Sequence, residues 1–275
     1  MQKLRRQVDQ TDLRMLRLLQ QRNKLTCEIG RLKRRHRSVI YVPERERALL
    51  ARLVRLSKGR LPKHLVTAIY REILSGSRAA QGQPPIGLLR TEANKVQTAV
   101  KSIFGASDRF SAQKSWDDLV HGVRSRALSV GLITATDLLG ALRKDSSWWE
   151  FARHLTVANA VPIASGTKVG TDAVLTITPP ANEAGKKADR FVILIECKST
   201  RNAIKTLFRD MPDLFLHDES STMRQTRSVL SLACLHAKRP VDTARMKRRL
   251  LKASESAKVP LLVVGTYLAT ESYGG

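Results

Sequence analysis

Polar side chains stand at positions of the first 81 residues where a helical core calls for apolar ones. These residues are Arg5, Arg22, Lys33, Arg45, Glu46, Ser77 and Gln81. Arg22 and Lys33 are 11 residues apart, close to three helical turns, so they project from nearly the same face, about 16 Å apart along the axis. Two such long cationic side chains can lean toward each other and bind a small dianion. Taken singly, Arg22 would instead pair with Glu46 inside a bundle, because a lone buried charge is unfavourable.

Three helices are predicted to position these groups. The first has an apolar seam in steps of three and four, interrupted by one arginine, at Leu4, Val8, Thr11, Met15, Leu18, Arg22, Leu25, Ile29 and Leu32. We expect a break over residues 37–42 and a second helix from Pro43, since proline suits the first helical position. The apolar stripe of the third helix continues into Ser77 and Gln81.

The pattern changes after a linker with glycine and proline at residues 81–85. Short strands are expected at residues 86–89, 109–112, 128–133 and 157–163, with helices between them near 92–104, 116–125 and 136–155. Alternation of this kind is typical of an α/β layer with parallel strands.

A different order of elements follows a loop at residues 179–187. Strands are expected at 191–196, 214–217, 228–235 and 260–267, and helices at 200–209 and 241–257. This β-α-β-β-α-β order is the ferredoxin-like arrangement. The predicted fold class is therefore a multidomain α plus α/β chain, with a three-helix domain at 1–82, a middle α/β lobe at 86–178 and a ferredoxin-like domain at 188–270.

The net charge and the hydropathy of the chain limit the classes of molecule or surface that it could bind. The chain has a formal charge of +25, and residues 1–81 hold 21 Lys and Arg against 6 Asp and Glu. Such a charge raises the hypothesis of nucleic-acid binding. The first 81 residues contain no aromatic platform, zinc motif or helix-turn-helix pattern, so we expect no specific nucleic-acid partner. No run of about 18 apolar residues is present, so no membrane span is expected.

The cysteines and histidines show no spacing typical of metal ligands. Cys27, Cys197 and Cys234 are far apart and odd in number, which suits a reducing compartment better than a disulfide framework. The N-terminal residues lack the apolar core of a secretory signal. We therefore expect a cytoplasmic protein without a metal site.

Residues 4–81 resemble the all-helical chorismate mutase family, including the domain fused to prephenate dehydratase in bifunctional enzymes of phenylalanine biosynthesis. The resemblance lies in Leu4-Arg5, Asp9 with Asp12, Arg22, Lys33, Pro43-Glu44-Arg45-Glu46, Ile69-Tyr70-Arg71-Glu72-Ile73 and Ser77-Arg78-Ala79-Ala80-Gln81. It implies the rearrangement of chorismate to prephenate in aromatic amino-acid biosynthesis, without cofactor or metal, in a homodimer whose N-terminal helices interlock.

The resemblance also implies which residues would bind the carboxylates of chorismate. Arg22 and Arg5, the latter reaching in from the partner subunit, would clamp two carboxylates, a task that suits the guanidinium group. Ser77 would bind a carboxylate as well. Arg45 would support the pocket.

Other residues would, by the same resemblance, bind the reacting part of the substrate. Lys33 and Gln81 would donate to the ether oxygen of the breaking bond, and Glu46 would bind the ring hydroxyl. Many relatives have an aspartate where this chain has Val42. We expect this departure to weaken binding before it impairs catalysis.

The rest of the chain resembles the other parts of the bifunctional enzyme more loosely. The middle region resembles the first lobe of a prephenate dehydratase in its strand–helix order, but residues 88–94 and 134–137 replace two of its motifs. Its Thr-Arg-Phe signature has only the counterpart Asp189-Arg190-Phe191, which lacks the threonine hydroxyl. We expect a degenerate or repurposed lobe.

The C-terminal region resembles an ACT domain, a ferredoxin-like module that often binds amino acids between paired copies. This resemblance implies that the C-terminal region binds an amino-acid effector. The alternative is that the region serves as a dimerisation module. The main prediction for the whole chain is a chorismate mutase. The alternatives are a bifunctional mutase–dehydratase and a basic helical protein without catalytic activity that binds an acidic partner.

Overall fold

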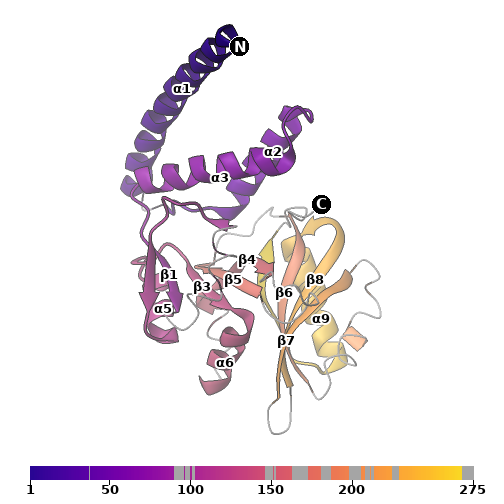
Figure 1. Ribbon diagram of the computed structural model, residues 1–275. Coiled ribbons are helices and arrows are strands. Elements are labelled where there is room, and N and C mark those ends of the chain that lie inside the picture. Colours follow the sequence, from indigo (N-terminus) through magenta and orange to yellow (C-terminus); the bar gives the residue numbers. More distant parts are fainter. Residues whose placement is uncertain are drawn as a thin grey trace.

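The computed structural model joins a helical N-terminal region to an α/β region that is built on one large sheet (Figure 1). The structure describes residues 1–36, 38–89, 96, 100, 103–145, 151, 153–162, 173–180, 187–197, 206–207, 211, 214–224 and 229–267. In this part of the chain, no helix is long and apolar enough to cross a membrane.

The helical region contains α1 (Gln2–Arg35), α2 (Pro43–Ser57) and α3 (Lys63–Ala80). These helices confirm the three predicted ones, and Pro43 begins α2 as expected. Lys58 and Gly59, with φ of 49° and 74°, form the left-handed end of α2 and turn the chain toward α3. α2 and α3 pack against each other, and the C-terminal part of α1 contacts α3.

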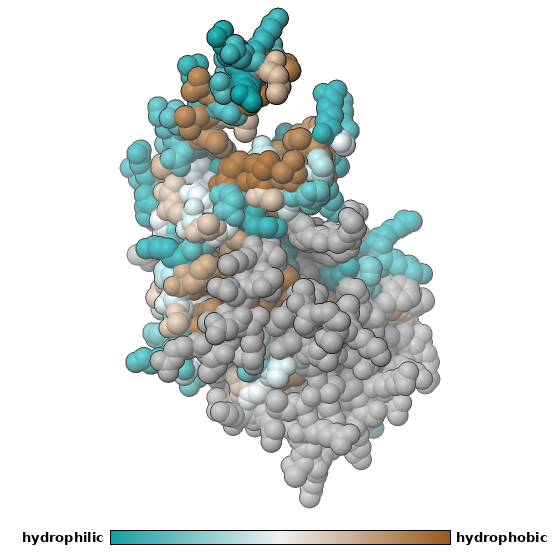
Figure 2. Space-filling model, in the orientation of Figure 1, coloured by the Kyte–Doolittle hydropathy of each residue, from teal (hydrophilic) through white to brown (hydrophobic). Residues whose placement is uncertain are grey.

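The N-terminal half of α1 projects away from the rest of the chain (Figure 1). With 34 residues, the helix is about 50 Å long. Its apolar seam is open to solvent: Leu4 is 65% exposed, Leu18 64% and Leu32 53%. Figure 2 shows apolar side chains gathered on the outer faces of α1 and of the helices below it. Among the residues that the structure describes, none covers the seam along its length.

The α/β region is a nine-stranded sheet in the order β2-β1-β3-β5-β4-β9-β6-β8-β7. In chain order the strands are β1 (Ile86–Leu89), β2 (Phe110–Gln113), β3 (Gly131–Thr134), β4 (Thr156–Pro162), β5 (Ala173–Thr178), β6 (Lys187–Cys197), β7 (Leu214–Arg224), β8 (Val229–Asp242) and β9 (Leu261–Tyr267). The described helices beside them are α5 (Trp116–Arg124), α6 (Ala135–Asp145) and α9 (Thr243–Ala257).

The prediction of parallel strands in the middle lobe is only partly confirmed. β1 runs parallel to both β2 and β3. The strand β5 was not predicted, and it is antiparallel to both β3 and β4. Only ten residues separate β4 from β5, fewer than the dozen or more that a parallel crossover needs. The middle of the sheet is therefore mixed.

The strand order β9-β6-β8-β7, antiparallel throughout, is the order that a β-α-β-β-α-β chain produces in a ferredoxin-like fold. The second helix of this unit is α9. Asp242 caps its N-terminal end, because the Asp242 side chain accepts a hydrogen bond from the backbone N–H of Arg245. The first helix, predicted at 200–209, lies outside the described residues except for Thr206 and Leu207, which are helical.

Sheet and core are continuous across the predicted boundary between the middle and C-terminal domains. β4 pairs with β9 at Val157 and Gly265. A Cβ at Gly265 would lie 2.3 Å from the carbonyl oxygen of Val157, so only glycine permits this approach. One apolar core holds residues from both sides of the boundary, among them Leu175 and Val192.

Candidate active site

The contact between α1 and α3 brings together two predicted site residues that are 55 positions apart in the chain. The guanidinium of Arg22 donates a hydrogen bond from Nη1 to Oγ of Ser77. The hydroxyl of Ser77 donates in turn to the carbonyl oxygen of Ile73, at 2.6 Å, one turn earlier in α3. Ser77 is buried and Arg22 is half-buried. A cationic donor that is partly withdrawn from water thus faces the end of α3.

Gln81 lies at the C-terminal end of α3, against the backbone of α1. A Cβ at Gly30 would lie 2.9 Å from Cα of Gln81, so the glycine permits the two helices to approach. Arg34 donates to the carbonyl oxygen of Gln81 at 2.6 Å. The Gln81 side chain is buried, and its Nε2 donates to the carbonyl oxygen of Ser77 at 3.1 Å. Its Oε1 is buried without a hydrogen-bond partner among the described residues.

Lys33 reaches from the last turn of α1 toward the segment that precedes α2. Its Nζ donates to the carbonyl oxygen of Ile40 at 2.8 Å. Burial lowers the pKa of Lys33 from its ordinary value, the positive charge of Arg45 lowers it further, and Glu46 opposes both effects. Arg45 itself is exposed. Lys33 therefore lies among charged groups from α2, as a donor whose proton is held less tightly than usual.

The carboxylate of Glu46 pairs with Arg78, a residue to which the sequence analysis assigned no role. Nη1 of Arg78 donates to Oε2 of Glu46 at 2.6 Å. The alternative in which Arg22 pairs with Glu46 is therefore wrong, since Arg22 contacts Ser77 instead. Burial raises the pKa of Glu46, and the neighbouring Arg78 opposes that rise.

Arg78 is also bound by Asp108, which comes from the α/β region. Nε and Nη2 of Arg78 donate to the two carboxylate oxygens of Asp108 at 2.9 and 2.6 Å. Both side chains are buried. No periodicity marked Arg78 in a chain with 49 Lys and Arg, and Asp108 lies outside the helical region. The one signal for Arg78 was its place in the motif at residues 77–81, which carries the family resemblance.

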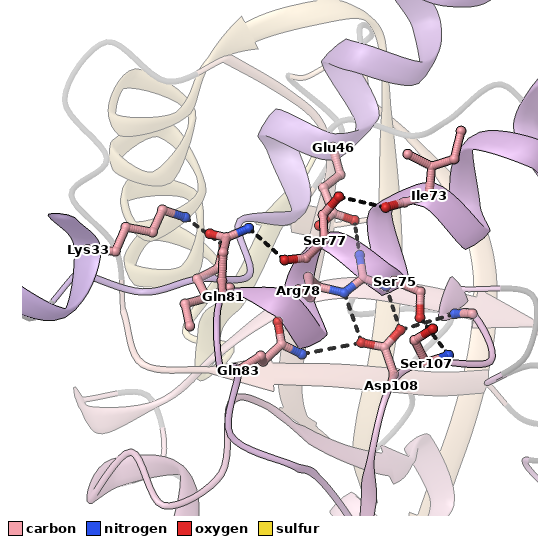
Figure 3. A network of polar contacts seen from close by, with 12 residues as sticks. Lys33, Glu46, Ile73, Ser75, Ser77, Arg78, Gln81, Gln83, Ser107 and Asp108 are labelled. Carbon is pink, nitrogen blue, oxygen red and sulfur yellow. Dashed lines mark hydrogen bonds and ion pairs between the residues drawn. The ribbon is translucent and has the colours of Figure 1, made fainter. Parts of the chain in front are cut away.

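Figure 3 shows Lys33, Ser77, Gln81, Glu46 and Arg78 in one polar network at the junction of the three helices. Arg5 is not part of it. It is exposed on the projecting part of α1, and 17 residues of helix place it about 25 Å from Arg22 along the axis. Within one chain, these two arginines cannot bind the same small ligand.

The network offers hydrogen-bond donors and positive charge to an anionic ligand, with one carboxylate as acceptor. Arg22, Lys33 and Gln81 are the donors, and Glu46 is the acceptor. Among the described residues, no group of three or more His, Cys, Asp and Glu side chains could hold a metal ion. The arrangement can bind an anion and stabilise charge that develops on it.

Comparison with known proteins finds a family match over the helical region. Residues 4–82 match the family described as chorismate mutase type II. The bifunctional chorismate mutase/prephenate dehydratase of Aquifex aeolicus is 30% identical over 137 residues, which cover 48% of this chain and 38% of that protein. The corresponding protein of Neisseria gonorrhoeae is 34% identical over 122 residues, 44% of this chain and 33% of that protein. The chain thus spans well under half the length of these curated relatives.

Among solved structures, prephenate dehydratase from Streptococcus mutans aligns with 68% of this chain and 100% of its own, at 9% identity and a TM-score of 0.44. All seven predicted site residues lie within the residues that match the chorismate mutase family, whereas Asp108 lies beyond them.

Proposed function

We propose that the chorismate mutase type II domain at residues 4–82 is catalytically active and rearranges chorismate to prephenate. The observation that carries this proposal is the convergence of Arg22, Ser77 and Gln81 at the contact between α1 and α3. The rearrangement is intramolecular and needs no nucleophile or cofactor. An enzyme must hold the substrate in its folded conformer and stabilise the charge that develops on the ether oxygen.

Arg22 and Ser77 bind one end of the substrate in this proposal. The pair already forms a hydrogen bond in the structure, so both side chains point to the same place. A carboxylate can accept from the guanidinium and from the hydroxyl together. The second carboxylate is bound by Arg5 of a second subunit, because Arg5 of the same chain is too far away. Arg45 adds positive charge at the rim of the pocket.

The reacting bond lies, in the same proposal, between Lys33 and Gln81. The Nζ of Lys33 and the Nε2 of Gln81 exchange their present backbone carbonyl partners for the ether oxygen. These donors stabilise the transition state more than the ground state, because negative charge grows on the oxygen as the bond breaks. Glu46 accepts a hydrogen bond from the ring hydroxyl. Val42 is apolar, so its side chain contributes no hydrogen bond to the substrate.

A homodimer with interlocked N-terminal helices completes the proposed site. The exposed seam of α1 supports it, because contiguous apolar surface of this extent marks an interface. The separation of Arg5 from Arg22 supports it independently. A second α1 along the seam would cover Leu4 and Leu18, and would bring its own Arg5 to the site.

The remaining regions are proposed to be structural or regulatory. The ferredoxin-like strand order of residues 188–270 supports an ACT-like module, which would bind an amino-acid effector or promote dimerisation. We place the protein in the cytoplasm, as the few and distant cysteines suggest.

Product analysis tests the proposed activity. The purified 275-residue chain is incubated with chorismate, and the products are identified over time. We expect prephenate to accumulate, and Arg22→Ala to lower kcat/KM by about 100-fold or more, the expected effect of removing a charged clamp. Phenylpyruvate would instead support the bifunctional alternative. If the wild-type chain turned over no chorismate, the mutase proposal would fail and the non-catalytic alternative would take its place.

A further inference from the structure

One loop of the α/β region, residues 105–109, runs along α3 and is hydrogen-bonded to it. The backbone N–H of Ala106 donates to Oε2 of Glu72 at 2.9 Å. The backbone N–H of Ser107 donates to Oγ of Ser75 at 3.0 Å. Both contacts join α3 to the loop that precedes β2. They attach the helical region to the α/β region close to the proposed mutase site.

The same loop holds Asp108 against Arg78. The loop's own backbone fixes the aspartate, since Gly105 donates from its N–H to Oδ2 at 3.1 Å. Gln83 approaches Oδ1 at 3.5 Å. Asp108 then binds Arg78 through both of its oxygens, and this paired geometry sets the plane of the guanidinium group. With that plane set, the third nitrogen, Nη1, points at Glu46.

Two aromatic rings that lie close to the guanidinium group of Arg78 restrict its orientation further. Its guanidinium carbon lies 5.4 Å from the ring centre of Tyr41 and 5.7 Å from that of Phe104. Tyr41 precedes α2, and Phe104 belongs to the α/β region. The side chain of Arg78 is 3% exposed, that of Asp108 1% and that of Glu46 20%. A buried ion cluster of this kind is stable only while each charge keeps its partner.

Glu46 is the most exposed member of the cluster, and its charge acts on Lys33 of the proposed site. Arg78 binds its Oε2, and the other carboxylate oxygen can accept a hydrogen bond from a ligand hydroxyl. The geometry of that acceptor depends on Arg78, and the geometry of Arg78 depends on Asp108. This series of contacts, from Asp108 through Arg78 to Glu46, therefore connects the α/β region to the helical site.

We propose, on the basis of the mutase function proposed above, that Asp108 is a positioning residue of the mutase site. It orients Arg78, and Arg78 orients the carboxylate of Glu46 toward the ring hydroxyl of the substrate. The α/β region thereby forms part of the mutase, beyond the residues that match the mutase family.

The test compares two carboxylate-to-amide substitutions on the same interface in the whole 275-residue chain. Asp108→Asn removes the charge and one of the two bonds to Arg78. Glu72→Gln is the matched control, because Glu72 binds the same loop but contacts neither Arg78 nor Glu46. We expect Asp108→Asn to lower kcat/KM for chorismate about tenfold, mainly through KM. We expect Glu72→Gln to change it less than about twofold, whatever it does to Tm.

A double-mutant cycle distinguishes a positioning role of Asp108 from a general loss of packing at this interface. If Asp108 acts through Glu46, Asp108→Asn should lower kcat/KM by less than about twofold in a Glu46→Gln background. An equal tenfold loss in both backgrounds would mean that Asp108 acts elsewhere, and would overturn the inference. So would an Asp108→Asn variant with a lowered Tm and unchanged kinetics. A wild-type chain without turnover would refute the mutase function and this inference together, whereas these results with an active wild type refute the inference alone.

Discussion

The ammonium group of Lys33 is half-buried beside Arg45, and both conditions lower its pKa from the ordinary value of 10.5. In the proposed site, Lys33 acts as an ammonium group, whose positive charge stabilises the negative charge that develops on the ether oxygen. We therefore expect activity to fall on the alkaline side with a midpoint below 10.5, as the ammonium loses its proton. In Lys33→Arg the decline should move to higher pH, because guanidinium stays protonated. A pH–rate profile of kcat/KM checks this, and an unchanged alkaline midpoint in Lys33→Arg would assign that titration to another group.

Gln81 provides a second pH test at the scale of one residue. Gln is a neutral donor at every ordinary pH, whereas a glutamate must be protonated to donate. The side chain is buried, and burial raises the pKa of a carboxyl group. We expect Gln81→Glu to retain activity at acid pH and to lose it as the pH rises through the pKa of the new carboxyl group. A flat profile at full activity would contradict the role proposed for Gln81.

At the scale of the element, the approach of α1 to α3 depends on one glycine. A Cβ at Gly30 would lie 2.9 Å from Cα of Gln81, and a backbone atom cannot move aside as a flexible side chain would. We expect Gly30→Ala to lower the free energy of unfolding by about 1–3 kcal/mol, the range typical of overpacking. We also expect it to lower kcat, because Gln81 is displaced.

Gly76→Ala is the matched control for this substitution. Gly76 lies in the interior of α3, and a Cβ there would meet nothing closer than Oγ of Ser107 at 4.0 Å. Alanine is the better helix former, so the control should be neutral or raise the free energy of unfolding slightly. Thermal or denaturant unfolding of both variants gives the comparison, and equal losses would show that packing at Gly30 is not the cause.

At the scale of the whole molecule, the proposed dimer predicts complementation between inactive variants. Arg5→Ala and Arg22→Ala should each be inactive alone, because every site of either homodimer lacks one arginine. In a mixed dimer, the Arg22 of one chain meets the Arg5 of the other, so one site of the two is complete. Co-expression with random pairing should restore about one quarter of wild-type activity. No recovery in isolated mixed dimers would mean that both arginines act within one chain or that Arg5 has another role.

The proposed dimer also predicts how thermal stability depends on protein concentration, because the seam of α1 is exposed in the single chain. A helix with Leu4, Leu18 and Leu32 in water has little tertiary support of its own. The unfolding midpoint should therefore rise with protein concentration, as mass action requires when association covers the seam. Calorimetry over a range of concentrations measures this, and a constant midpoint together with a monomeric mass would contradict the interlocked dimer.

The helices were predictable because the signals that define them are local. The period of apolar residues, together with the position of Pro43, predicted α1, α2 and α3. The same period marked Ser77 and Gln81 as misplaced polar groups. The strands were predicted less well. β5 was missed, and its antiparallel pairing with β3 and β4 depends on partners that its own residues do not reveal.

By itself, the sequence determined three helices and the polar groups that interrupt their apolar faces, because helical periodicity is carried by neighbouring residues. Only the tertiary structure decided which of those groups meet. Arg22 contacts Ser77 across 55 positions, and Arg78 binds Asp108 across 30. Contacts at such separations depend on how whole elements pack, and a chain with 49 Lys and Arg offers many equivalent cations for each carboxylate. Packing selects among them, since only a buried cation with a buried partner is stable there.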